Sequence, residues 1–197
     1  MFYRLCRFIC LIFGKIAYRY RITGIENIPK DGAFLLCANH IHAFDPIVIT
    51  MFIKRIPKFM AKKELFTPGF GNWFFNNYGA YPIDRSAAVD MQAYRKTMDY
   101  LKNGHGVVIF SQGTRMEGFD NAKSGVAVFA LKSGAPIIPV GIRGSYKFFS
   151  KIYIHYGEPI LMDEYAGQKV KTELVELVMK QVVERVSALA ASEAAAI

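Results

Sequence analysis

The sequence predicts an α/β fold: a mixed, largely parallel sheet flanked by helices, with an amphipathic helix at the N-terminus. Three observations support this prediction. Short apolar runs typical of buried strands alternate with helical segments, which is the pattern of an α/β fold. The length of 197 residues suits one domain. Residues 1–21 differ from the rest in the spacing of their apolar residues and in their charge, so we expect them to form a separate helix before a single domain at 22–197.

The N-terminal segment combines an apolar stripe with a basic one. On a helical wheel the apolar face holds Phe2, Leu5, Cys6, Ile9, Ile12, Phe13, Ile16, Ala17 and Tyr20, and the opposite face holds Arg4, Arg7, Lys15 and Arg19. The longest uncharged run, 8–14, is far shorter than the roughly 20 residues that span a bilayer. We therefore expect a helix that lies in the membrane interface. The alternative is a helix packed on the domain's own core, with its basic face in solvent.

Strands are expected where short apolar runs are bounded by turn signals. The first opens at Arg21 and runs into a Pro-Gly loop. The others are expected at 33–38, 56–61, 79–83, 107–110, 136–142 and 151–156.

Helices are expected between these strands. Asp45-Pro46 predicts an N-cap and a helix that extends to about Ile53. Three more are expected: 87–102 started by Ser86, 124–133 closed by Gly134, and one from about Glu164 into the Ala-rich tail. The inner stripe of the last helix is predicted to be Leu174, Leu177, Val178, Val182, Val186 and Leu189. The aromatic stretch 65–78 is either a short helix or a membrane-facing loop.

The net charge of +9 comes from two patches, because residues 1–21 and 54–63 each carry five basic residues and no acidic one. Such patches predict an anionic partner, which could be a nucleic acid, an acidic protein or a membrane surface. Nucleic acid is disfavoured, since the nearby aromatic residues belong to aliphatic stripes rather than to a stacking platform. A hydrophobic content of 52% excludes intrinsic disorder. Three cysteines, all in apolar runs, indicate free thiols in a reducing compartment.

The most informative segment, 39–45, lies between a buried strand and the start of a helix. Loops at the carboxyl ends of strands are where α/β folds build their sites. Asp45 can hold one imidazole nitrogen of His40, which leaves the other nitrogen to take a proton from a hydroxyl group. The alternative is a structural histidine, with Asp45 serving only as an N-cap.

Asn39-His40-x4-Asp45 resembles the first motif of the glycerolipid acyltransferases, above all the 1-acylglycerol-3-phosphate acyltransferases. Other segments resemble that family's later motifs, in the family's order: 61–65, 79–85, 110–115 with 123–125, and 135–140. The resemblance covers residues from about 20 to 145 and identifies the domain at 22–197 as an acyltransferase domain.

The resemblance implies a set of roles. His40 would act as the general base, oriented by Asp45, on the sn-2 hydroxyl of 1-acyl-glycerol-3-phosphate. Acyl carrier protein or CoA would supply the acyl group as a thioester, with no cofactor and no metal, at the cytoplasmic face of the cell membrane. The substrate-binding residues would be Lys62, Arg85, Gln112, Gly113, Thr114 and Arg115. Arginine suits a phosphomonoester because its planar fork donates two parallel hydrogen bonds, and Gly113 would let backbone amides approach the headgroup.

Two departures from the family's pattern leave alternatives open. Ser111 and Gln112 replace Pro and Glu in the third motif, and His42 stands where Ser is common. His42 could compete for Asp45 or bind a metal together with His40. The acceptor could then be another lysophospholipid or glycerol 3-phosphate, or the protein could be a catalytically silent lipid-binding membrane protein. A covalent route through Cys37 or Ser111 is disfavoured, because neither residue lies in a G-x-S-x-G elbow.

Overall fold

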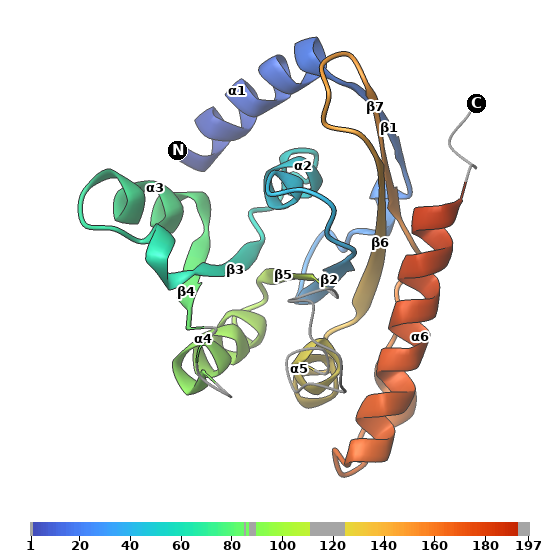
Figure 1. Cartoon of the computed structure of the whole chain (residues 1–197). Helices are drawn as coiled ribbons and strands as arrows, with labels where there is room; N and C mark the ends of the chain where they lie inside the picture. Colours follow the sequence, from blue (N-terminus) through green and yellow to red (C-terminus); the bar gives the residue numbers. More distant parts are fainter. Residues whose placement is uncertain (1, 85, 87–89, 111–124, 193–197) are drawn as a thin grey trace.

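The computed structural model describes residues 2–84, 86, 90–110 and 125–192 (Figure 1). In this part of the chain seven strands form one sheet, in the order β1-β7-β6-β2-β5-β3-β4. The strands are β1 (Arg19–Thr23), β2 (Phe34–Ala38), β3 (Lys58–Lys62), β4 (Ala80–Ile83), β5 (Gly106–Phe110), β6 (Ile137–Gly144) and β7 (Lys151–Tyr156). The α-helices are α1 (Phe2–Ala17), α2 (Asp45–Met51), α3 (Phe70–Tyr78), α4 (Met91–Lys102), α5 (Gly125–Ser133) and α6 (Thr172–Ala191).

The sheet is mixed and mostly parallel, which confirms the predicted fold class. Strands β6, β2, β5, β3 and β4 all run in the same direction. Strand β7 is antiparallel to β6, and β1 is parallel to β7. Strand β2 lies at the centre, and its five residues are completely buried. Because the five parallel strands run in one direction, the residues that end β2, β5, β3 and β4 lie along one edge of the sheet.

Helices cover both faces of the sheet, as Figure 1 shows, and alternate side chains of β2 separate two cores. Phe34, Leu36 and Ala38 lie on one face and pack with residues of α1, α2 and α3. Leu35 and Cys37 on the other face pack with residues of α4, α5 and α6. A central strand that is buried on both faces needs a continuous apolar run, which is why β2 was predictable.

The carbonyl groups at the end of α2 accept hydrogen bonds from other elements. Tyr156 Oη donates to the carbonyl of Ile49, and Tyr3 Oη donates to that of Thr50. Arg7 Nε donates to the carbonyl of Met51 at 2.6 Å. The last carbonyls of a helix have no partner within the helix, so these donors fix the position of α2.

This arrangement corrects the prediction for α1. Arg7 does not lie on a solvated basic face; it points inward and holds α2. Tyr3, Cys6 and Cys10 pack on the core, and the outward face is largely apolar. The wheel showed which residues share a face, but it could not show which face the rest of the domain would cover. Strand β1 begins at Arg19, before the domain boundary that we expected at residue 21.

Two helix starts differ from the prediction. Helix α4 begins at Met91 rather than Ala87, because Asp90 is the N-cap and accepts hydrogen bonds from the backbone of Gln92 and Ala93. Residues 87–89 lie outside the described residues. Helix α6 begins at Thr172, preceded at Asp163–Tyr165 by a single 3-10 turn.

Two more predictions are settled by burial and backbone conformation. Val175 of α6 is buried whereas Leu177 is 49% exposed, so Leu177 was placed wrongly in the inner stripe. The stretch 65–78, left open between helix and loop, contains α3. No helix in the described ranges has the length and apolar character needed to cross a bilayer.

Candidate active site

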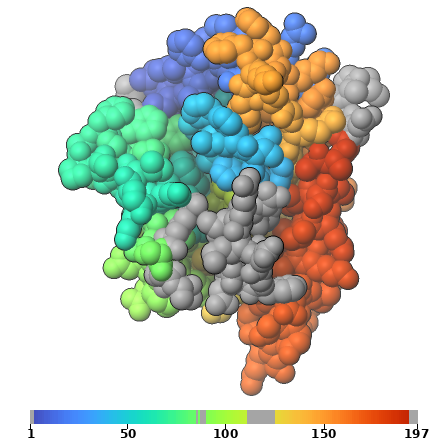
Figure 2. Space-filling view, viewed as in Figure 1, coloured from blue at the N-terminus to red at the C-terminus, as the bar shows by residue number. Residues whose placement is uncertain are grey.

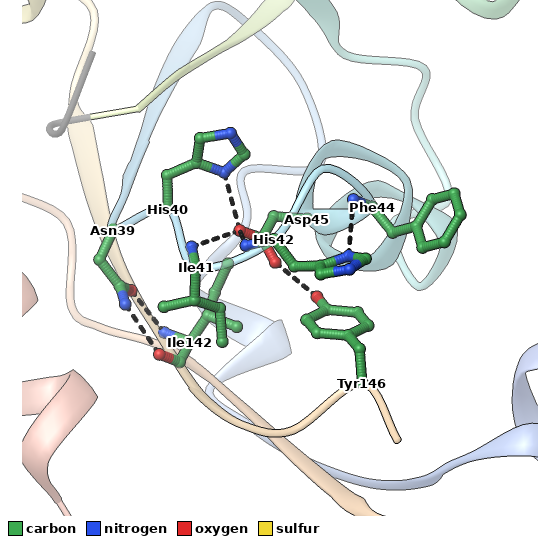
Figure 3. A network of polar contacts seen from close by, with 8 residues as sticks. All are labelled: Asn39, His40, Ile41, His42, Phe44, Asp45, Ile142 and Tyr146. Atoms are coloured by element: carbon green, nitrogen blue, oxygen red, sulfur yellow. Dashed lines mark hydrogen bonds and ion pairs between the residues drawn. The ribbon is translucent and has the colours of Figure 1, made fainter. Parts of the chain in front are cut away.

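The site begins where β2 ends, at the central strand's carboxyl edge. Asn39 follows β2 directly and is almost completely buried. Its side-chain amide donates to the carbonyl of Ile142 at 2.8 Å, and its oxygen accepts from the backbone N–H of Ile142 at 2.7 Å (Figure 3). Asn39 therefore behaves like a further residue of the ladder with β6, and it fixes the point at which the chain leaves the sheet toward His40.

His40 and Asp45 are in direct contact, as the sequence predicted. Nδ1 of His40 lies 2.7 Å from Oδ2 of Asp45. The Asp45 side chain is fully buried, whereas 36% of the His40 side chain is exposed. Nε2 of His40 points away from this network in Figure 3. The pair thus has the geometry that proton abstraction requires, with one imidazole nitrogen held by a carboxylate and the other available to a substrate.

Asp45 is not an N-cap, which corrects that prediction. The N-cap is Phe44, and Asp45 is the first residue of α2. Its Oδ2 accepts hydrogen bonds from the backbone N–H groups of Ile41 and His42, at 2.6 and 2.7 Å. The carboxylate therefore organises the loop that precedes the helix instead of satisfying the first N–H groups of the helix itself.

The second oxygen of Asp45 is bound by a residue that the sequence analysis missed. Tyr146, in the loop after β6, donates from Oη to Oδ1 of Asp45 at 2.5 Å. Tyr146 is 101 positions away in sequence, and a Gly-Ser-Tyr stretch after a strand gives no signal for this contact. Only the pairing of β2 with β6 brings the two residues together.

Hydrogen bonding keeps the Asp45 carboxylate charged. Burial acts to raise the pKa of Asp45, but hydrogen bonds from His40, Tyr146 and the backbone of His42 and Ile41 outweigh it and lower the pKa below its usual value. The pKa of Tyr146 moves the opposite way: burial, together with the adjacent Asp45 carboxylate, raises it far above its usual value. Tyr146 therefore stays protonated and donates at all ordinary pH values.

His42 does not compete with His40 for Asp45. Its ring stacks on Tyr146, with centroids 4.2 Å apart, and its Nδ1 accepts a hydrogen bond from the backbone of Phe44. Only its backbone N–H contacts Asp45. The His42 ring thus packs over the tyrosine that orients the carboxylate, so this departure from the family's pattern leaves the His40–Asp45 pair intact.

The ring of Phe110 lies against the ring of His40, with centroids 4.4 Å apart. Phe110 is the last residue of β5 and is paired in register with Ala38 of β2. The third motif continues from it, but Gln112, Gly113, Thr114 and Arg115 lie outside the described residues. Their predicted roles therefore rest on the family resemblance.

Lys62 ends β3 at the same edge of the sheet and is exposed. Strand β5 lies between β3 and β2, so the axes of β3 and β2 are about 10 Å apart. Next to Lys62, Lys63 Nζ forms an ion pair with Asp84 at 2.5 Å, which joins the end of β3 to the end of β4. Arg85 comes next in the chain and lies outside the described residues.

The second basic patch, 54–63, is not one surface. Its residues lie at both ends of β3, and these two ends are at opposite edges of the sheet. Arg55 lies before β3 and donates to the carbonyls of Pro29, Gly32 and Gly104. Lys58 is half buried over the ring of Tyr100, and burial together with the nearby Lys96 lowers its pKa. Of the five basic residues, Lys62 and Lys63 are the two at the carboxyl edge.

Cys37 has the environment of a structural thiol. It is completely buried in β2, and burial raises its pKa to about 12. A nucleophilic cysteine needs a lowered pKa and partial exposure. The environment of Cys37 therefore argues against a covalent route through this residue. Ser111 lies outside the described residues.

Comparison with known proteins agrees with this geometry. The family model described as Acyltransferase matches residues 19–143, which is more than half of the chain. The chain therefore belongs to the Acyltransferase family.

Several relatives carry one more specific name. The proteins named 1-acyl-sn-glycerol-3-phosphate acyltransferase from Borreliella burgdorferi and Bacillus subtilis are 28% and 27% identical to this chain. These alignments cover 85% and 89% of this chain, and 72% and 90% of the relatives. Among solved structures, the 1-acyl-sn-glycerophosphate acyltransferase PlsC from Thermotoga maritima matches with a TM-score of 0.67 and 27% identity, over 91% of this chain and 76% of that one.

Proposed function

We propose that this protein transfers a fatty acyl group from an acyl thioester to the sn-2 hydroxyl of 1-acyl-glycerol-3-phosphate, giving phosphatidate in phospholipid biosynthesis. The observation that carries the proposal is the contact between His40 and the fully buried carboxylate of Asp45. The names of the relatives support the choice of acceptor.

In the proposed reaction His40 is the general base. Nε2 removes the proton from the acceptor hydroxyl, and the hydroxyl oxygen attacks the carbonyl carbon of the thioester. The tetrahedral intermediate then collapses with loss of the thiolate, which takes the proton from His40. Asp45 keeps the neutral imidazole with its proton on Nδ1, which leaves Nε2 free to accept one. Once Nε2 has taken the proton from the hydroxyl, the imidazolium carries a positive charge, and the adjacent carboxylate stabilises it.

The acceptor's phosphate group is expected at the edge that Lys62 shares with the end of β4. Lys62 offers a point charge, and Arg85 and Arg115 offer planar forks that suit a phosphomonoester. Gln112, Gly113 and Thr114 complete the expected substrate site. The reaction as proposed needs no cofactor or metal beyond the donor, which is acyl-CoA or acyl carrier protein.

The enzyme is expected to work at the cytoplasmic face of the cell membrane, as a peripheral or monotopic protein. The support is the exposed apolar face of α1, which carries Leu5, Phe8, Ile9, Ile12, Phe13 and Ile16. Arg4 and Lys15 lie beside these residues and are also exposed, so the helix suits an anionic lipid surface.

The decisive experiment is mass spectrometry of products formed from a panel of lysolipids and glycerol 3-phosphate, with both donors. We expect phosphatidate from 1-acyl-glycerol-3-phosphate, and its loss with His40→Ala. Faster turnover of another lysophospholipid would change the acceptor but keep the mechanism. Lipid binding without turnover of any acceptor would instead support the silent lipid-binding protein.

A further inference from the structure

The loop that joins β6 to β7 has an apolar tip. Phe148 is 76% exposed and Phe149 is 69% exposed, and their ring centroids are 6.2 Å apart. We call these two residues the loop tip. Single exposed apolar residues are common on soluble proteins, but two adjacent phenylalanines this exposed point to a surface that something covers.

The backbone holds the loop tip in an unusual conformation. Phe149 has φ of 62°, in the left-handed region, and among the described residues other than glycine it alone has a positive φ. A bulky side chain rarely adopts this conformation, which persists only where surrounding contacts maintain it. Here the N–H of Phe149 donates to the carbonyl of Ala17, the last residue of α1, at 2.7 Å.

This hydrogen bond places the loop tip at the C-terminal end of α1. Figures 1 and 2 show the β6–β7 loop, in orange, beside α1, in blue, at one end of the molecule. Ile16 immediately precedes Ala17, is 67% exposed and belongs to the outward apolar face of α1. The loop tip therefore adjoins that face.

The charges around the loop tip are all positive and favour an anionic partner. Lys147 and Lys151 flank it, Lys15 and Arg19 lie on the adjoining segment, and all four are exposed. No acidic residue occurs in 1–21 or in 145–151. Exposed aromatic side chains surrounded by basic residues suit an anionic bilayer, because the aromatic rings enter the headgroup region and the basic residues attract the anionic lipids. A second copy of this chain would bring the same positive charge, which disfavours self-association through this surface.

We propose that the loop tip is a second membrane-insertion point, which enters the headgroup region of an anionic bilayer beside α1. The proposal rests on the proposed function in one respect, that the acceptor is a lipid. Tyr146, which binds Asp45, lies in the same loop, and Tyr18 donates from its Oη to the carbonyl of Tyr146 at 3.3 Å. Insertion of the loop tip thus anchors the loop that also contacts the site.

The test measures binding of the full chain to vesicles of phosphatidylglycerol and phosphatidylcholine by co-sedimentation. The test variant combines Phe148→Ser with Phe149→Asn, because asparagine tolerates the left-handed conformation that Phe149 adopts. We expect roughly tenfold weaker partitioning, given the apolar area of the two rings. The matched control is Leu177→Ser, an exposed apolar residue of α6, the helix whose buried side chains pack on the other face of the sheet, and it should bind as the wild type does.

A second readout reports insertion directly. Trp73 is the one tryptophan of the sequence, so Trp73→Phe combined with Phe148→Trp leaves a single probe at the loop tip. Its fluorescence should shift to shorter wavelength with anionic vesicles and be quenched by brominated lipids. Unchanged vesicle binding of the double variant, or a probe that stays in water, would overturn the proposal, as would dimer formation that the double variant abolishes.

These results are separable from the proposed function. If the wild type inserts its loop tip but acylates no lysolipid, the proposed reaction fails while the insertion point stands. If acyl transfer is intact and the double variant binds vesicles normally, the insertion point fails alone. With a short-chain acceptor below its micellar concentration, the double variant should turn over at the wild-type rate.

Discussion

Tyr146 Oη donates a hydrogen bond to Oδ1 of Asp45 at 2.5 Å, while His40 Nδ1 lies 2.7 Å from Oδ2 of the same carboxylate. Both oxygens are therefore held, and the carboxyl group cannot rotate without breaking several hydrogen bonds. The orientation of the His40 ring thus depends on a tyrosine that does not touch it. This relationship makes Tyr146 a positioning residue.

Replacing Tyr146 with phenylalanine should lower kcat with little change in KM for the acceptor. A hydrogen bond to a charged group contributes about 1.5–3 kcal/mol, so we expect a loss of that order in stability and a kcat that is lower by about tenfold. Steady-state kinetics and urea unfolding measure the two effects. Because the hydrogen bond lowers the pKa of Asp45, its removal should also make the loss of stability in acid less steep. An unchanged kcat, or a change confined to KM, would contradict this role.

Replacing His40 with alanine should abolish most activity while leaving the fold in place. General-base catalysis contributes about 10²- to 10⁴-fold. The loss of one hydrogen bond to the buried Asp45 carboxylate should cost about 1.5–3 kcal/mol of stability, which the domain can lose and still fold. The measurement is turnover of acyl-CoA by thiol release, with circular dichroism as the control for folding. Activity within a few-fold of wild type would refute the general-base assignment.

Asp45 should make the protein less stable in acid. Its pKa is lowered by folding, so its contribution is fully present above the ordinary value of 3.8 and is lost as pH falls through the lower folded-state value. The unfolded chain binds the proton more readily there, and protonation favours unfolding. Urea midpoints measured from pH 5 downward should fall more steeply for wild type than for Asp45→Asn, although the variant is less stable at pH 7. Parallel curves would contradict the assigned direction.

Lys62 should affect acceptor binding more than turnover. Lys62→Ala is expected to raise KM for 1-acyl-glycerol-3-phosphate by about tenfold, since it removes a charge-assisted contact to phosphate. The matched control is Lys54→Ala, which removes the same charge from an exposed lysine ahead of β3, at the opposite edge of the sheet. Equal effects of the two variants would mean that Lys62 acts only through net charge, and strong salt dependence of both would accompany that result.

Cys37→Ala and Ser111→Ala should each retain most activity. The Cys37 thiol is buried and its pKa is raised to about 12, so it should also resist maleimide reagents in the folded protein. Intact mass spectrometry during turnover tests the same point, because direct transfer predicts no acyl-enzyme. A mass increase equal to one acyl chain, or near-complete loss of activity in either variant, would establish the covalent route.

The fold was predictable from the sequence because its central signals are local. The apolar run at 33–38 identified β2, since a strand buried on both faces must be apolar throughout. The predicted end of α4 at residue 102 is also confirmed, because Asn103-Gly104 is a local signal that stops a helix. The start of α4 was misplaced because serine and aspartate both serve as N-caps, and the sequence offers Ser86 and Asp90. In the structure it is Asp90 that accepts the hydrogen bonds from the first N–H groups of the helix.

The sequence by itself determined the family, the α/β class and the pairing of His40 with Asp45, because these depend on short spacings and on the order of motifs along the chain. Only the tertiary structure decided which face of α1 is covered, that Arg7 holds the end of α2, and that Tyr146 donates a hydrogen bond to the second oxygen of Asp45. These contacts join segments between about 40 and 100 positions apart, and their partners are backbone carbonyls or single oxygen atoms. Such partners produce no pattern of spacing or composition in the sequence. These contacts are therefore fixed only when the strands of the sheet pair in register.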